Sequence, residues 1–267
     1  MSAAPLALYD SHCHLHDARI GDEAEALLLR ARAAGVEALL LAGVDPPGWA
    51  VEVALAARHP ELRVSYGAHP QVVAEADEGE ADALCAALAR ALDGELPRPA
   101  AVGEIGLDAM GDRAASLPLQ EAVFRRQLAL AAAHRLPVAL HVLRAHGRAL
   151  DVLAAAPPPA GGVLHSCSAS AEDVRRYLRL GLSISFSGAV ANPSARRLRA
   201  AARVVPLDRL LVETDAPDQT PFPRRPARNE PAFLVEIVDA LAQIRGEPVE
   251  VVARASRDNA RRLFDER

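Results

Sequence analysis

The chain has 267 residues, of which 51% are hydrophobic and 24% are charged, with a formal net charge of −5. This length suits one globular domain over residues 1–267, and the acidic balance excludes a broad positive field of the kind that attracts nucleic acids. A nuclease is still compatible with this charge, because bound metal ions supply positive charge locally. No apolar run approaches the roughly 18 residues of a membrane span. All 30 basic residues are arginine.

Cysteine usage and the N-terminus indicate the compartment. Cys13, Cys85 and Cys167 are odd in number and show no CxxC spacing, which is typical of a reduced cytosol rather than of a disulfide framework. The first residues, MSAAPLALYD, contain no charged segment before an apolar stretch, so we expect no signal peptide. We therefore expect a cytoplasmic protein without membrane contact. The sequence predicts no particular oligomeric state and is compatible with a monomer.

Short apolar runs alternate with longer segments of helical periodicity along the chain. The expected strands cover residues 6–11, 36–42, 62–67, 100–107, 137–142, 161–166, 182–187 and 209–215. Apolar residues at helical spacing lie between them, for example at 123–133 and 174–180. Eight such repeats predict parallel strands with helices outside, and they favour a closed (β/α)8 TIM barrel over an open sheet. We expect the Pro- and Arg-rich loop 216–231 to lie over the active site, and the tail from Pro248 to form one or two closing helices.

Six side chains that bind metals well lie at or just after the ends of the apolar runs. They are His12, His14, Glu104, His141, His165 and Asp215. The active site of a (β/α)8 barrel lies at the carboxyl ends of its strands, so these side chains would meet there. Residues two apart in a strand face the same side, which predicts that both histidines of the HCH motif point into the barrel mouth. The pattern predicts a metal-dependent hydrolase.

The two carboxylates have separate expected roles. A buried carboxylate such as Glu104 needs a cation or hydrogen-bond donors, and an ion pair with an arginine is the alternative to metal binding. Related barrel hydrolases often bridge two metals with a carbamylated lysine, which a chain without lysine cannot provide, so we expect Glu104 to be the bridge. We expect Asp215 to bind one metal and to accept a proton from the attacking water. Glu213 is expected to be structural.

Other residues are expected to support catalysis or to contact the substrate. His69, in SYGAHP, is expected to contact substrate or transfer a proton, and a turn histidine before Pro70 is the alternative. Arg144 and Arg228 are candidate phosphate clamps, because arginine binds phosphate bidentately; solvated arginines are the alternative. Four histidines are expected at the surface or in supporting positions: His16, His59, His134 and His146. The candidate aromatic residues for base stacking are Trp49, Phe186 and Phe222.

Segments along nearly the whole chain resemble the TatD family of metal-dependent nucleases, within the amidohydrolase-type barrels. In chain order they are DSHCHL, GAHP, AVGEIGLD, FRRQLALAAAHRLPVALH, GVLHS, SFSGAV, LDRLLVETDAP, RNEP and NARRLF. VGEIGLD and LLVETDAP are the most specific of them. The resemblance implies a (β/α)8 fold and a cytosolic, divalent-metal-dependent phosphodiesterase that acts on DNA. By position it implies the same six metal ligands, with His69 at the site.

The chain departs from the family pattern around the expected substrate rather than around the metals. His16 stands where the family usually has an acidic residue, and HPQ replaces a frequent HPH. HSCSAS replaces a segment that usually has an aromatic residue and a glycine, and GLDAMGD lacks the aromatic residue that often follows GLD. These differences leave hydrolysis intact and leave the substrate open.

The leading hypothesis is a deoxyribonuclease of the 3′–5′ exonuclease type that acts on single-stranded DNA with two divalent metal ions. His12, His14 and Asp215 would hold one ion, His141 and His165 the other, and Glu104 would bridge them. Histidine-rich ligation suits Zn, Mn, Co or Ni, and the resemblance also allows Mg. One alternative is a hydrolase of a small amide, ester or phosphoester, because aromatic residues make up only 3% of the chain. Another is a non-catalytic metal-binding subunit.

Overall fold

The computed structural model of the protein describes residues 6–266, and eight strands in this part of the chain form one sheet in the order β1 to β8. The strands are β1 (Leu8–Cys13), β2 (Val36–Leu41), β3 (Leu62–Tyr66), β4 (Ala101–Asp108), β5 (Val138–Leu143), β6 (Gly162–Leu164), β7 (Leu182–Phe186) and β8 (Leu210–Val212). The α-helices are α1 (Ala24–Ala33), α2 (Pro46–Ala56), α3 (Pro70–Glu75), α4 (Glu78–Arg90), α5 (Leu117–His134), α6 (His146–Ala155), α7 (Ala171–Arg179), α8 (Arg196–Val204), α9 (Leu234–Arg245) and α10 (Val249–Phe264). None of these helices is long and apolar enough to cross a membrane.

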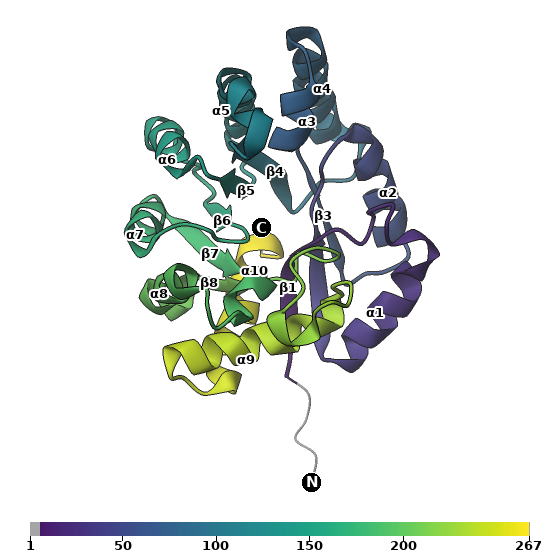
Figure 1. Ribbon diagram of the computed structural model, residues 1–267. Coiled ribbons are helices and arrows are strands. Elements are labelled where there is room, and N and C mark those ends of the chain that lie inside the picture. Colours follow the sequence, from purple (N-terminus) through teal and green to yellow (C-terminus); the bar gives the residue numbers. More distant parts are fainter. Residues whose placement is uncertain (1–5, 267) are drawn as a thin grey trace.

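Consecutive strands pair in parallel, and the last strand returns to the first. The Asp215 amide just after β8 donates to the His12 carbonyl of β1 at 2.9 Å, and the Ser11 hydroxyl donates to the Val212 carbonyl at 2.9 Å. The sheet thereby closes into a barrel with the helices around it (Figure 1). The predicted (β/α)8 barrel is confirmed, and each of the eight predicted runs overlaps a strand.

The strands are covered on both faces, which explains why they read as continuous apolar runs rather than as alternating patterns. All eight residues of β4 are buried, including its polar ones. The larger apolar cluster lies between the strands and the outer helices, and a smaller one fills the barrel interior.

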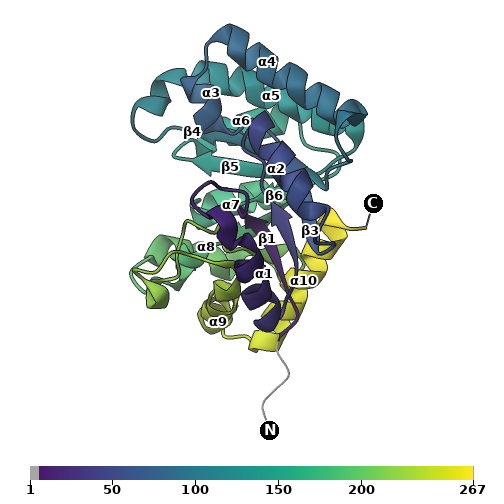
Figure 2. The same cartoon turned by 90° about the vertical axis from the view of Figure 1, so that its right-hand side faces the viewer.

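Helix α10 closes the amino-terminal end of the barrel. The ring of Phe264 lies 6.2 Å from that of Tyr9 in β1, and both belong to the smaller interior cluster. The Asn259 side chain donates to the Leu210 carbonyl at the start of β8 at 2.9 Å. Figure 2 shows α10 in yellow beside the strands, near the carboxyl terminus. The tail therefore forms a closing helix as predicted, and the carboxyl ends of the strands are left for the site.

A glycine in β4 allows β4 and β5 to approach each other closely beside the site. Gly106 has φ +142°, and a Cβ atom placed on it would lie 2.0 Å from the His141 carbonyl oxygen. Gly106 pairs with His141 in the register of the two strands. The relative position of Glu104 and His141 therefore depends on the absence of a side chain at position 106.

We predict that Gly106→Ala lowers the free energy of unfolding by more than about 1 kcal/mol, because the added methyl group meets backbone atoms and φ is unfavourable. Urea unfolding measures this change. Gly147→Ala in α6 is the matched control, because a Cβ there meets nothing within 4 Å. Equal stability of the two variants would contradict the packing argument.

Candidate metal centre

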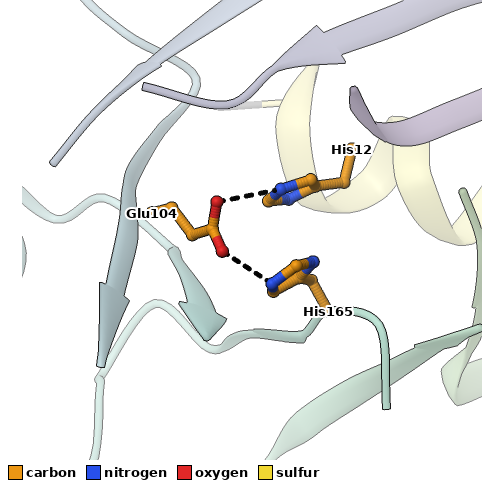
Figure 3. Close-up of side chains that lie close together, drawn as sticks. All are labelled: His12, Glu104 and His165. Atoms are coloured by element: carbon orange, nitrogen blue, oxygen red, sulfur yellow. Dashed lines mark hydrogen bonds and ion pairs between the residues drawn. The ribbon is translucent and has the colours of Figure 1, made fainter. Parts of the chain in front are cut away.

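Glu104 lies among histidines that come from different strands of the barrel. Its side chain is 2% exposed, and its Oε2 atom is 3.2 Å from His12 Nε2 and 3.6 Å from His14 Nε2. Its Oε1 atom is 2.7 Å from both His141 Nδ1 and His165 Nε2. Figure 3 shows the carboxylate reaching toward His12 with one oxygen and toward His165 with the other. Residues far apart in the sequence therefore meet around one buried carboxylate.

Asp215 lies on the β1 side of this group. Its Oδ1 atom is 3.4 Å from His14 Nε2 and 3.9 Å from His12 Nε2. Its backbone has φ 60°, a left-handed conformation that aspartate adopts more readily than most residues. Because its amide donates to the His12 carbonyl, the turn after β8 is held against the end of β1.

A buried aspartate that the sequence analysis did not identify ties these two chain segments together. Asp10 Oδ1 accepts the amide of Thr214 at 2.9 Å and that of His12 at 3.3 Å, and Oδ2 accepts the Thr214 hydroxyl. The signal for this role was an acidic residue inside an otherwise apolar strand. Asp10 thus positions the residues on either side of the barrel closure, one of which is His12.

Three histidines each have one ring nitrogen that faces away from the centre. Each of these outer nitrogens lies near a hydrogen-bond acceptor. His14 Nδ1 is 3.1 Å from a backbone carbonyl oxygen just after β2. His141 Nε2 is 3.5 Å from Asp108 Oδ2, and His165 Nδ1 is 3.4 Å from Glu213 Oε1. Metal-binding histidines usually donate their outer N–H to such groups, which leaves the inner nitrogen with a free lone pair. Asp108 was not predicted from the sequence, although it ends β4, and Glu213 was expected to be structural.

The histidine nitrogens and the carboxylate oxygen that face one another at the centre need a cation between them. His141 Nδ1 and His165 Nε2 are 3.1 Å apart, and both face the same oxygen of Glu104. Lone pairs and a carboxylate oxygen repel one another at this distance unless a proton or a metal ion lies among them. Three groups within residues 6–266 bring possible ligand atoms within 4.8 Å of one another: His12–Glu104–His165, His12–His14–Asp215 and His69–Glu104–His141. This nitrogen and oxygen donor set suits a divalent metal ion.

His69 differs from the other histidines in its protonation. Its Nδ1 accepts the backbone N–H of Gln71 at 3.1 Å, so a neutral ring must carry its hydrogen on Nε2. Nε2 lies 3.1 Å from Glu104 Oε1 and can donate to it. Burial lowers the pKa of His69 to about 4, which keeps the ring neutral. His69 is therefore a hydrogen-bond donor at this centre, and its inner nitrogen has no lone pair for a metal.

Of the histidines expected at the surface or in supporting positions, His16 and His59 are largely buried, and His16 lies beside the centre. Its side chain is 6% exposed, and Nε2 is 3.3 Å from Glu52 Oε1, whose side chain is fully buried. The His16 ring also lies 5.7 Å from the His14 ring. The Glu52 partner comes from α2, and nothing in the local sequence around His16 indicates that pairing.

A pocket with a volume of about 480 Å³ opens beside the centre. His141, His165 and Asp215 line one part of it, and Arg196 and Arg197 at the start of α8 line another. Neither arginine was predicted from the sequence, because both lie outside the strand ends and the loop 216–231.

The two predicted phosphate clamps, Arg144 and Arg228, are not among the residues that line this pocket. Arg228 instead donates to Glu23 Oε2 at 2.6 Å and to the Arg19 carbonyl at 2.8 Å, which ties its loop to the segment before α1. Arg144 is exposed just after β5. The Arg228 side chain is thus engaged within the protein, and a phosphate contact by Arg144 stays a prediction.

Two of the three candidate stacking residues are inaccessible. Trp49 is 2% exposed and Phe186 is 0% exposed, so the expectation that they stack on bases is wrong. Trp49 instead donates its indole N–H to the Gly67 carbonyl inside the protein. Phe222, in the loop 216–231, is 50% exposed.

Comparisons with known proteins identify the family. The model of the family "TatD related DNase" matches residues 9–265. The chain is 34% identical to the uncharacterized metal-dependent hydrolase YjjV of Escherichia coli K12, over 96% of this chain and 97% of that protein. It is 37% identical to the 3′-5′ ssDNA/RNA exonuclease TatD of Erwinia billingiae, over 96% and 98% of the two chains. The crystal structure of the Escherichia coli TatD homologue YjjV superposes with a TM-score of 0.90 at 32% identity, covering 97% of this chain and 98% of that one. The chain therefore belongs to the TatD related DNase family and is a metal-dependent hydrolase.

We predict that metal binding at neutral pH releases protons from the protein. Burial disfavours charged histidines, but Glu104 more than offsets this for His165, whose pKa is raised well above its usual value. The pKa of His141 is likewise raised against burial, by Asp108 and Glu104. The metal-free centre thus retains protons that a bound metal must displace, so apparent affinity rises as pH rises.

Calorimetric titration with Mn²⁺ in two buffers of different ionisation enthalpy measures this release. His134→Gln is the control, because His134 lies outside the centre and faces Asp93. A titration that releases no protons, with the same affinity at pH 6 and pH 8, would contradict the electrostatic account.

Proposed function

We propose that this TatD-family hydrolase is a divalent-metal-dependent deoxyribonuclease that removes nucleotides from the 3′ end of single-stranded DNA. The observation that carries the proposal is the buried carboxylate of Glu104 amid inward-facing histidine nitrogens. The similarity to relatives named 3′-5′ ssDNA/RNA exonuclease supports the choice of substrate. Relatives of similar identity are named only as metal-dependent hydrolases, so the substrate is the part that most needs a test.

We assign the centre two metal ions that share Glu104. His12, His14 and Asp215 would hold one ion, because their ligand atoms lie within 4.8 Å of one another. His141 and His165 would hold the other through the nitrogens that face Glu104. Bound divalent ions lower the pKa of water and polarise a phosphoryl oxygen. The donor atoms suit Zn, Mn, Co or Ni, and Mg is compatible with the carboxylates.

Asp215 is the residue that we expect to accept the proton of the attacking water. Burial alone would raise the pKa of its carboxyl, but a hydrogen bond with His14 and nearby positive charge lower it below its usual value. The carboxylate is therefore ionised at neutral pH and can accept a proton. It lines the pocket, so a substrate that enters the pocket reaches it directly.

We expect His69 to hold the carboxylate of Glu104 in position at the centre. Its Nε2–H faces Glu104 Oε1 and the centre, while the Gln71 amide fixes the ring. A donor fixed in this way keeps the Glu104 carboxylate oriented without reorganisation during the reaction. This role is consistent with a histidine that is neutral at working pH.

The rim of the pocket supports a polymeric anion over a small amide or ester. Arg196, Arg197, Ser168 and Ser194 are exposed there, so the pocket is open to a chain end. Asp215 is the one carboxylate among its lining residues, and it belongs to the centre itself. A phosphate chain that enters therefore meets arginines rather than like charge.

We predict that metal-stripped protein re-supplied with Mn²⁺, Mg²⁺ or Zn²⁺ shortens 5′-labelled single-stranded DNA from its 3′ end. Asp215→Asn should lower kcat by roughly 10²–10⁴-fold, the contribution of a general base. Asp218→Asn is the matched control on the same loop, because its side chain is exposed and pairs with Arg19.

A protein that binds metal but leaves every DNA substrate intact would contradict the deoxyribonuclease and favour a small ester, amide or phosphoester. An Asp215→Asn variant with full activity would contradict the proton-accepting role alone.

A further inference from the structure

The start of α8 forms the wall of the pocket away from the candidate metal ligands. Residues 194–198 line this wall, whereas His141, His165 and Asp215 line the wall at the centre. One cavity of about 480 Å³ joins the two walls, a size typical of small-ligand sites. A molecule held at the metal centre therefore extends toward α8.

The two arginines on this wall carry charge that no neighbouring residue neutralises. Within residues 6–266, neither the Arg196 nor the Arg197 side chain makes an ion pair or a hydrogen bond. The arginines of the loop 216–231 are different, because Arg224 pairs with Glu236 and Arg228 with Glu23. Arg196 and Arg197 are thus free to bind an anion in the pocket.

The pocket is lined largely by apolar side chains. Val142, Leu143 and Leu198 line it, and no aromatic side chain does so among the residues that border the pocket. Aliphatic side chains can contact a sugar or a base without selecting its identity, and they provide none of the stacking energy of an aromatic ring. Binding in this pocket must then depend mainly on contacts with phosphate.

We propose that Arg197, with Arg196 beside it, binds the phosphate next to the one that is cleaved, so that the preferred substrate carries at least two phosphodiester groups. The inference rests on the proposed nuclease function and adds a specificity-determining subsite to it. The metal centre binds the scissile phosphate, and a planar guanidinium binds its neighbour bidentately. Small esters with a single phosphate would leave this subsite unused.

The test compares two substrates that differ by one phosphodiester group, the dinucleotide TpT and the trinucleotide TpTpT. In the metal-loaded wild-type protein, kcat/KM should be higher for TpTpT by about 10-fold or more, the effect of one charge-assisted hydrogen-bonded contact. Arg197→Ala should remove this preference, because kcat/KM should fall about 10-fold more for TpTpT than for TpT. Arg199→Ala on the same helix is the matched control, because Arg199 does not line the pocket. Equal losses on both substrates, or no loss on either, would overturn the subsite.

A binding measurement separates failure of the subsite from failure of the nuclease function. Fluorescein-labelled oligothymidylate is titrated into metal-loaded Asp215→Asn protein, with and without Arg197→Ala, at several salt concentrations. Loss of one phosphate contact should reduce the slope of log K against log salt by about 0.7. If neither TpT nor TpTpT is cleaved, the nuclease function fails and this slope alone decides the subsite. An unchanged slope would overturn it.

Discussion

The architecture of the site depends on the electrostatics of one buried carboxylate. Glu104 is removed from water, and an isolated charge in that position would be strongly disfavoured. It is surrounded by histidines from three other strand ends and by His69 after β3. The buried negative charge therefore strongly favours a positive charge, a proton or a metal ion, among these side chains. The histidines in turn depend on acceptors behind them, such as Asp108 and Glu213. The whole group of side chains around Glu104 therefore indicates a metal centre more strongly than any single ligand does.

The barrel provides the rigidity that the centre needs. The site spans the closure between β1 and β8, where Asp10 accepts hydrogen bonds from both segments and the Asp215 amide binds the His12 carbonyl. On the opposite side of the centre, Gly106 sets the spacing between β4 and β5. The hydrogen bonds of Asp10 and the close approach at Gly106 are far apart in the sequence. Together they fix the positions of the residues that surround Glu104.

The barrel fold and the residues that meet at its strand ends were predictable from the sequence. Polar residues at the ends of apolar runs are easily recognised, and a barrel brings strand ends together. The same reasoning could not find pairings between distant elements. The Glu52 partner of His16 lies on α2, and the Glu23 partner of Arg228 precedes α1. Arg196 and Arg197 escaped notice because the position of α8 over the pocket depends on the path of the chain after β7. Trp49 and Phe186 looked available for stacking because burial of a single aromatic residue cannot be read from composition.

Crystals of the protein soaked with Mn²⁺ and measured at the manganese absorption edge would test the central claim most directly. The account predicts two anomalous peaks about 3.5–4 Å apart, the usual separation in two-metal hydrolases, with Glu104 in contact with both. It also predicts that His69 Nε2 contacts neither ion, because that nitrogen carries a hydrogen. A single ion away from Glu104, or direct coordination by His69, would contradict it.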